Sequence, residues 1–437
     1  MKIASISAYQ VFDSRGQPTI EAEVALQDGT RGRGTVPSGA STGQFEALEL
    51  RDGDPKRFRG KSVFKAIANV RDIIRPALLG RDVFDQRGLD QTMIDLDGTP
   101  NKKQLGANAI LAVSMAAVQA AARARNEPLH AYLGTGNLLP LPEIQITGGG
   151  AHANWRTDVQ DYLLIATGAR SYAEVMEITY NVYHAAGEIL KKRGKYFGVA
   201  DEGGYWPDFA SNEEALQLLV EAIELAGYQP GRDAAISLDV AASDLFDEHT
   251  GKYRFSLEQR EFSTAEFAAL LEDWCARYPI ISIEDPMADT DWEGWQMVFQ
   301  KIGQRVQIIG DDVFTTNIAR IRAGIEKRIA NAVLIKLNQI GTVTETLDAI
   351  QVTQQAGWLP VVSARSGETE DAFIAHLAVA TNAGQLKVGS FSRSERMAKW
   401  NEVIRIERQL AGQARFVGSG IFQSILPGFA SVGPRPD

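Results

Sequence analysis

The sequence predicts an α/β barrel preceded by a smaller α+β domain. From residue 140 onward, short apolar runs alternate with amphipathic helical stretches, as in a chain built from repeated strand and helix units. Charged residues stand at the ends of six of these runs, where a barrel places its active site. The first third of the chain mixes alternating strands with helices instead. A doubly wound parallel sheet is the alternative that the same alternation permits.

Composition sets the broad class of the protein. The chain has 437 residues, of which 44% are hydrophobic and 23% are charged, enough to build two domains with one large core. A formal net charge of -10 argues against nucleic acid or an anionic membrane as partner. Cys275 is the only cysteine, so no intrachain disulfide can form. We therefore expect a packed thiol and a cytoplasmic protein.

The amino-terminal third predicts a small α+β domain. Strands are expected at residues 1–9 and 19–26, and helices at 62–79 and 108–126. The helical stretch that starts at Ala107 is Ala-rich but contains Asn108, Ser114 and Gln119, which indicates a buried helix and not a membrane span. Residues 32–42 are rich in Gly, Ser and Thr, a composition typical of a mobile loop, either a plain connection or a lid.

The rest of the chain predicts the barrel. Pro140 and Pro142 mark a boundary, so we expect a capping domain at 1–135, a barrel at 140–412 and an extension at 413–437. Helices are expected between the strands, for example at 317–329 and 345–356. The apolar runs are typical of buried parallel strands and occupy residues 234–238, 280–283, 306–309, 332–335, 359–362 and 386–388.

Charged residues follow these runs in register. A single charged residue often ends a strand at the surface, but six of them at converging strand ends indicate a functional site. The six are Asp239, Glu284, Asp311, Lys336, Arg365 and Lys387.

Three of the strand-end residues are carboxylates, which as hard oxygen ligands suit Mg²⁺ better than zinc. Asp239, Glu284 and Asp311 are therefore candidate ligands, although each could also be a helix cap or a loop acid. Asp312 could take the place of Asp311, and the sequence leaves both open.

Two of the strand-end residues are lysines in otherwise apolar strands. Desolvation and a neighbouring cation would lower the pKa of Lys336 or Lys387 toward the range of a general base. The alternative is a lysine that extends from the barrel rim into solvent.

Several loop residues complete the candidate set. Glu202 lies in an Asp-Glu-Gly-Gly turn whose glycines allow close approach to a ligand. Arg365 and Ser366 could hold a phosphate through a guanidinium and a hydroxyl. His152 follows three glycines, and the other four histidines receive no role.

The motifs of this sequence, in their order, resemble the enolase family along nearly the whole chain. They include Ser38-Gly39-Ala40-Ser41-Thr42-Gly43, Asp201-Glu202-Gly203-Gly204 and Lys336-Leu337-Asn338-Gln339. Further matching blocks lie at residues 14–19, 96–99, 239–243, 283–286, 366–371 and 393–396. The resemblance implies an amino-terminal capping domain on a modified TIM barrel, in a cytoplasmic, glycolytic homodimer or higher homo-oligomer.

The resemblance also implies a reaction and its residues. The reaction is the Mg²⁺-dependent conversion of 2-phosphoglycerate, a small phosphorylated hydroxy acid, into phosphoenolpyruvate. Lys336 would be the base and Glu202 the acid, in a superfamily known for a Lys or His base with Mg²⁺ on the ene-diolate. A first Mg²⁺ would bind Asp239, Glu284 and Asp311, and a second would arrive with the substrate under Ser41. Arg365 and Ser366 would hold the phosphate, and Lys387 would hold the substrate carboxylate. His152, Gln160 and Asp161 would line the pocket.

The departures from the family pattern cluster around the substrate's hydroxyl end. Ala364 replaces a histidine, Asp161 replaces a glutamate, and Trp155 and Trp206 stand where smaller residues are usual. We therefore expect proton abstraction to be retained and departure of the leaving group to be altered. An ordinary glycolytic enolase with tolerated substitutions is the first alternative. A phosphonate-processing relative such as carboxyphosphonoenolpyruvate synthase is another, and a non-catalytic binding protein is a third.

Overall fold

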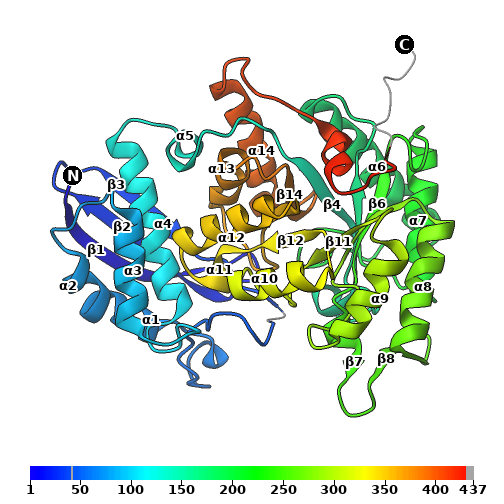
Figure 1. The fold of residues 1–437 in the computed structure, drawn as a ribbon, viewed down its shortest axis with the longest axis horizontal. Helices are drawn as coiled ribbons and strands as arrows, with labels where there is room; N and C mark the ends of the chain where they lie inside the picture. The colour runs from blue at the N-terminus through cyan, green and yellow to red at the C-terminus, as the bar shows by residue number, and fades with distance from the viewer. Residues whose placement is uncertain (41–42, 430–437) are drawn as a thin grey trace.

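The computed structural model describes residues 1–40 and 43–429. Figure 1 shows the amino-terminal domain at one side of the molecule and a barrel at the other. The capping domain begins with an antiparallel sheet in the order β1-β2-β3 (Ile3–Phe12, Pro18–Leu26 and Arg31–Thr35). Its helices are α1 (Phe64–Asn69), α2 (Arg75–Leu78), α3 (Gln86–Asp97), α4 (Ala107–Ala124) and α5 (Leu129–Leu133).

Strand β3 corrects the prediction of a loop at residues 32–42. Residues 31–35 pair with β2, and Gly32 and Gly34 lie directly on helix α4. A Cβ atom at Gly32 would come within 2.2 Å of the carbonyl oxygen of Ala116. The glycines therefore permit close packing of the strand on the helix, a role that their composition does not distinguish from that of a loop.

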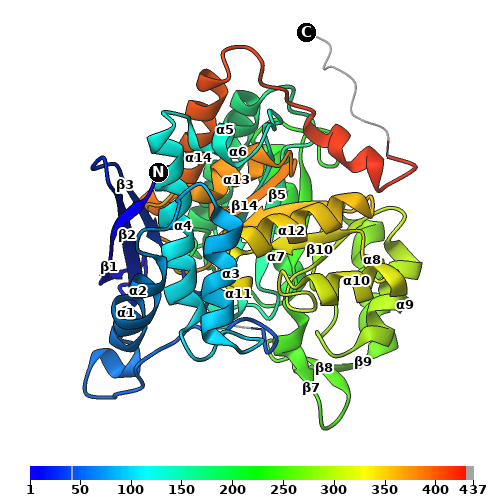
Figure 2. The same ribbon diagram turned by 60° about the vertical axis from the view of Figure 1, so that its left-hand side comes forward.

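Helix α4 is the core of the capping domain. By length and composition alone it could cross a membrane, but 83% of it is buried inside the protein. It packs against β2 and β3 on one side and lies beside α3, as both views show (Figures 1 and 2). The predicted buried helix is therefore confirmed.

The second domain is a closed eight-stranded barrel in the order β10-β11-β12-β13-β14-β4-β5-β6. Strand β5 runs antiparallel to both of its neighbours, and the other pairs are parallel, which makes this a modified (β/α) barrel. The doubly wound alternative is therefore wrong. The strands are β4 (Leu141–Gly148), β5 (Asp161–Ile165), β6 (Ala235–Asp239), β10 (Ile280–Glu284), β11 (Gln307–Gly310), β12 (Ala332–Ile335), β13 (Leu359–Ser363) and β14 (Gln385–Ser390).

Helices surround the barrel and bury its outer face. They are α6 (Tyr172–Lys192), α7 (Asn212–Leu225), α8 (Thr264–Arg277), α9 (Trp292–Ile302), α10 (Ile318–Lys327), α11 (Leu337–Ile340), α12 (Val343–Gln355), α13 (Phe373–Ala380) and α14 (Ser394–Gln409). A small sheet of β7 (Phe246–Asp247), β8 (Lys252–Phe255) and β9 (Arg260–Ser263) lies between β6 and α8 in the chain. Residues 413–429 fold back on the barrel, where Ser419 Oγ donates to the carbonyl of Thr167 at 2.7 Å. The boundaries at 135/140 and 412/413 stay predictions.

A layer of polar side chains crosses the interior of the barrel. Gln385 Nε2 and Ser237 Oγ each donate to the carboxyl group of Glu143 at 3.0 Å. Gln307 Nε2 donates to Gln385 Oε1 at 2.7 Å and connects this layer to β11. Because these groups are buried, each one depends on its neighbours for hydrogen bonds.

Candidate active site

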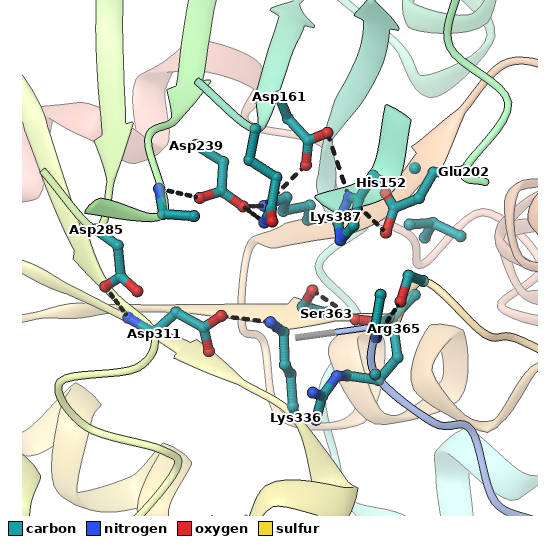
Figure 3. Close-up of a pocket in the computed structure, with 18 of the residues that line it drawn as sticks. His152, Asp161, Glu202, Asp239, Asp285, Asp311, Lys336, Ser363, Arg365 and Lys387 are labelled. Carbon is teal, nitrogen blue, oxygen red and sulfur yellow. Dashed lines mark hydrogen bonds and ion pairs between the residues drawn. The ribbon is translucent and has the colours of Figure 1, made fainter. Parts of the chain in front are cut away.

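The carboxyl ends of the parallel barrel strands surround one pocket, shown in Figure 3. The segment with Gly39 and Ala40 reaches it from the capping domain. The pocket brings together most of the residues predicted from sequence, namely His152, Gln160, Asp161, Glu202, Asp239, Asp311, Lys336, Arg365, Ser366 and Lys387. Glu284 joins them by contact with Lys387. Ser41 lies outside the described residues.

Lys387 binds two carboxylates in the wall of the pocket. Its Nζ atom lies 2.7 Å from Asp239 Oδ2 and 2.7 Å from Glu284 Oε2. Burial alone would raise the pKa of Asp239, but the Lys387 ammonium lowers it to about 2. Burial and the nearby Asp239 charge raise the pKa of Glu284 well above its usual value. The two buried carboxyl groups of Asp239 and Glu284 therefore favour additional positive charge beside them.

Lys336 contacts Asp311 across the pocket. Its ammonium donates to Asp311 Oδ2, and Gln339 Nε2 donates to Asp311 Oδ1 at 2.7 Å. Burial alone would lower the pKa of Lys336, but the carboxylates, first of all Asp311, raise it above its usual value. The lowered pKa expected from sequence presupposes a neighbouring cation and stays a prediction, whereas here the desolvated ammonium has a carboxylate in direct contact.

Asp285 organises the turn that carries Asp311. Its two carboxylate oxygens accept the backbone N–H groups of Asp311 at 2.8 Å and Asp312 at 2.9 Å. Oxygens of these three residues lie close enough together to hold a metal ion. Both Asp285 oxygens accept from the turn, and both Asp311 oxygens accept from Lys336 and Gln339, so the choice between Asp311 and Asp312 as ligand stays open.

The carboxylates fit a divalent cation. Asp239, Glu284 and Asp311 offer buried hard oxygen ligands from three successive barrel strands, and Glu284 Oε1 is buried without a hydrogen-bond partner among the described residues. Such an orphaned carboxyl oxygen is costly unless a cation or a donor reaches it. Among the described residues, Asp285, Asp311 and Asp312 bring their oxygens close enough to share an ion, whereas Asp239 and Glu284 are bridged by the Lys387 ammonium.

Arg365 and Ser366 form a second, positively charged side of the pocket. The Arg365 guanidinium lies 3.0 Å from Glu46 Oε2 and 3.0 Å from Asn338 Oδ1. Burial alone would lower the pKa of Arg365, but Glu46 raises it above its usual value. Ser366 Oγ accepts the backbone N–H of Ala40 at 2.7 Å, which connects the capping segment to this side.

His152, Asp161 and Glu202 face one another at the remaining side (Figure 3). His152 Nδ1 lies 3.6 Å from Asp161 Oδ1 and 3.7 Å from Glu202 Oε1. Burial alone would lower the pKa of His152, but the two carboxylates, Glu202 first, raise it. A protonated imidazole between two carboxylates can deliver a proton to a departing group.

The two tryptophans do not line this pocket, contrary to expectation. Trp155 is 49% exposed, and neither it nor Trp206 is among the described side chains that form the pocket wall. The Arg156 guanidinium lies over the rings of Trp206 and Phe197, 4.9 and 5.1 Å from their centroids. The contacts of Trp206 and Phe197 with Arg156 therefore stabilise the loop behind His152. Ala364 does line the pocket, as its position after β13 predicts.

Sequence reasoning missed several residues that support the site. Glu46, Asp285 and Gln145 each contact a predicted site residue. Asp285 had a usable signal, since it follows Glu284 directly at a strand end. Glu46 and Gln145 act through contacts that only the folded chain creates.

Comparison with known proteins agrees with this geometry. The family model for the enolase N-terminal domain matches residues 3–133, and the model for the enolase C-terminal TIM barrel domain matches residues 136–425. A protein of Desulfitobacterium hafniense (strain Y51) described as Enolase 1 is 57% identical over 424 residues, which cover 96% of this chain and 97% of that protein.

Proposed function

The chain belongs to the enolase family, and from this premise we propose that it dehydrates 2-phosphoglycerate to phosphoenolpyruvate. The observation that carries the proposal is the convergence of a carboxylate wall, a lysine, a side with Arg365 and Ser366, and a cluster of His152 with two carboxylates on one pocket. Each of these groups matches one part of the substrate.

Asp239, Glu284 and Asp311 would hold Mg²⁺, which when bound supplies positive charge for the doubly negative ene-diolate. A second ion would arrive with the substrate, with Ser41 beside it. Arg365 and Ser366 would hold the phosphate through charge-assisted hydrogen bonds. Lys387 would attract the substrate carboxylate, and its charge is retained because Asp239 and Glu284 stabilise the ammonium.

Lys336 would remove the proton from the carbon that carries the phosphate. The proposal needs Lys336 as a neutral amine, and its contact with Asp311 favours the ammonium. Asp311 is also a proposed metal ligand, so ligation of its carboxylate would weaken this contact. Lys336 would then meet the condition for a general base, a low enough pKa in a desolvated site.

The leaving hydroxide would depart toward His152 and Glu202. Glu202 would donate the proton, with His152 next to it at 3.7 Å. Ala364 lacks the imidazole of the histidine that it replaces, but the imidazole of His152 and the carboxyl groups of Asp161 and Glu202 remain. This remaining cluster supports ordinary dehydration over the altered elimination expected from the departures.

The alternatives are less well supported. The 57% identity to a protein described as Enolase 1 does not favour a phosphonate-processing paralogue. The retained charged pocket likewise does not favour a non-catalytic protein. A homodimer or higher homo-oligomer, a cytoplasmic location and a role in glycolysis belong to the proposal as properties usual for the family.

A substrate comparison tests the proposal. The protein is given 2-phosphoglycerate or its phosphonate analogue at equal concentration, and the enolpyruvyl product is followed by its ultraviolet absorbance. We expect faster turnover of 2-phosphoglycerate. Preference for the phosphonate would overturn the proposed substrate but retain the lyase chemistry, and absence of product from both would overturn the proposal itself.

A further inference from the structure

A buried amide behind the pocket connects the Asp161 carboxylate to the backbone of the turn that carries Glu202. Gln145, in the middle of β4, is fully buried. Its Nε2 atom donates to Asp161 Oδ1, and its Oε1 atom accepts the backbone N–H of Gly204 at 2.8 Å. The same side chain therefore holds the start of β5, which carries Asp161, and the turn that carries Glu202.

The glycines around this amide show how closely it fits. A Cβ atom at Gly204 would lie 2.5 Å from Gln145 Oε1, and one at Gly148 would lie 3.2 Å from Gln145 Nε2. Backbone approaches the amide from both sides, so its position is set within narrow limits. A change of one methylene in this side chain would move at least one of its two partners.

The fold does not depend on this amide alone. The backbone of the Glu202 turn is joined to β4 by two further hydrogen bonds, from Tyr205 N to the Ile146 carbonyl and from Gly148 N to the Tyr205 carbonyl, both 2.9 Å. On the other side, no other described side chain donates a hydrogen bond to the Asp161 carboxylate, whose further contacts are longer ion pairs to His152 Nδ1 at 3.6 Å and Lys387 Nζ at 3.8 Å. Loss of the amide would therefore leave the carboxylate held only by these longer contacts while the turn stays attached.

We propose that Gln145 is a positioning residue that sets the relative placement of Asp161 and Glu202, and through them the proton delivery to the leaving group. This inference rests on the proposed function. A neutral amide suits the role because it orients the carboxylate without neutralising it, so His152 keeps its two anionic neighbours at 3.6 and 3.7 Å.

The contact between Gln145 and Asp161 offers a specific test. Gln145→Asn shortens one partner by a methylene, and Asp161→Glu lengthens the other, so the double variant restores the combined reach. Proton exchange at the α-carbon in deuterated water and formation of phosphoenolpyruvate are measured in the same samples. Gln307→Asn, which shortens a buried amide in the barrel interior, is the matched control.

We expect Gln145→Asn to slow elimination by about 10- to 100-fold while proton exchange stays within about threefold of the unmodified protein. The double variant should eliminate at least about tenfold faster than Gln145→Asn, because the two side chains are coupled neighbours. Gln307→Asn should lower the melting temperature without changing the ratio of exchange to elimination.

Two results would overturn the inference. The first is an unchanged elimination rate in Gln145→Asn. The second is an equal loss of exchange and elimination in that variant with no recovery in the double variant, which indicates a purely structural role. If the unmodified protein neither exchanges nor eliminates, the proposed function fails instead.

Discussion

At the scale of single residues, the pocket separates two kinds of proton chemistry. Lys336 lies against Asp311 on one side, and Glu202 lies beside His152 on another (Figure 3). A base and an acid on different sides of one substrate can act in successive steps. This separation means that substitutions on the two sides should have different kinetic effects.

Lys336→Ala should abolish exchange of the substrate's α-proton with deuterated water, by at least about 100-fold, because the substitution removes the base. Glu202→Gln should retain exchange and slow elimination by about 100- to 10,000-fold, because the acid acts after proton removal. Nuclear magnetic resonance follows exchange, and absorbance follows product. Equal loss of both processes in both variants would contradict this division of labour.

The residue scale also shows what sequence can and cannot reveal. The strand-end positions of Asp239, Lys336 and Lys387 follow from the pattern of apolar runs, because barrel topology brings those ends together. The pKa of Lys336 could not be predicted, because it depends on which carboxylate the ammonium meets. The same applies to Gln145, whose partners lie 16 and 59 residues away in sequence.

At the scale of elements, strand β3 illustrates an ambiguity in glycine. A glycine-rich stretch is typical of a loop, yet Gly32 and Gly34 belong to a strand because α4 leaves no space for side chains. Six of the eight barrel strands follow from their apolar runs, whereas β4 and β5 are missed and β3 depends on its tertiary neighbour. Strand β4 escapes prediction because buried polar residues such as Glu143 and Gln145 interrupt its apolar pattern.

Gly34→Ala tests this packing. A Cβ atom there would lie 2.6 Å from the carbonyl oxygen of Ala112 and 2.6 Å from Met115 Cβ. We expect the free energy of unfolding to fall by about 2–3 kcal/mol, measured by urea denaturation. Gly428→Ala, where nothing lies within 4 Å, should change it by less than about 0.5 kcal/mol. An equal effect of both substitutions would show that β3 tolerates side chains against α4.

At the scale of the whole molecule, the barrel contains a buried acid that the proposed reaction does not use. Burial raises the pKa of Glu143 from 4.5 to about 7, against an opposing effect of Lys387. The folded protein therefore holds this proton more tightly than the unfolded chain does. The resulting stabilisation is complete below pH 4.5 and is lost as the pH rises through 7.

Glu143→Gln should remove this pH dependence. A neutral amide can accept from Gln385 and donate to the Ser237 hydroxyl, so both hydrogen bonds can persist. We expect the variant to gain about 2–3 kcal/mol of stability at pH 8 relative to the unmodified protein and little at pH 5. Urea denaturation at both pH values measures the difference, with Glu224→Gln on the exposed face of α7 as control. A gain of the same size at both pH values would contradict a raised pKa.

The central claim concerns the whole molecule, because capping domain, barrel and metal must act together in dehydration. The most direct measurement is formation of phosphoenolpyruvate from 2-phosphoglycerate by the purified protein with saturating Mg²⁺, after removal of the ion with EDTA, and after its return. The account predicts turnover with Mg²⁺, loss of turnover with EDTA and recovery when Mg²⁺ is added again. Undiminished turnover after exhaustive EDTA treatment, or no phosphoenolpyruvate under saturating Mg²⁺, would contradict it.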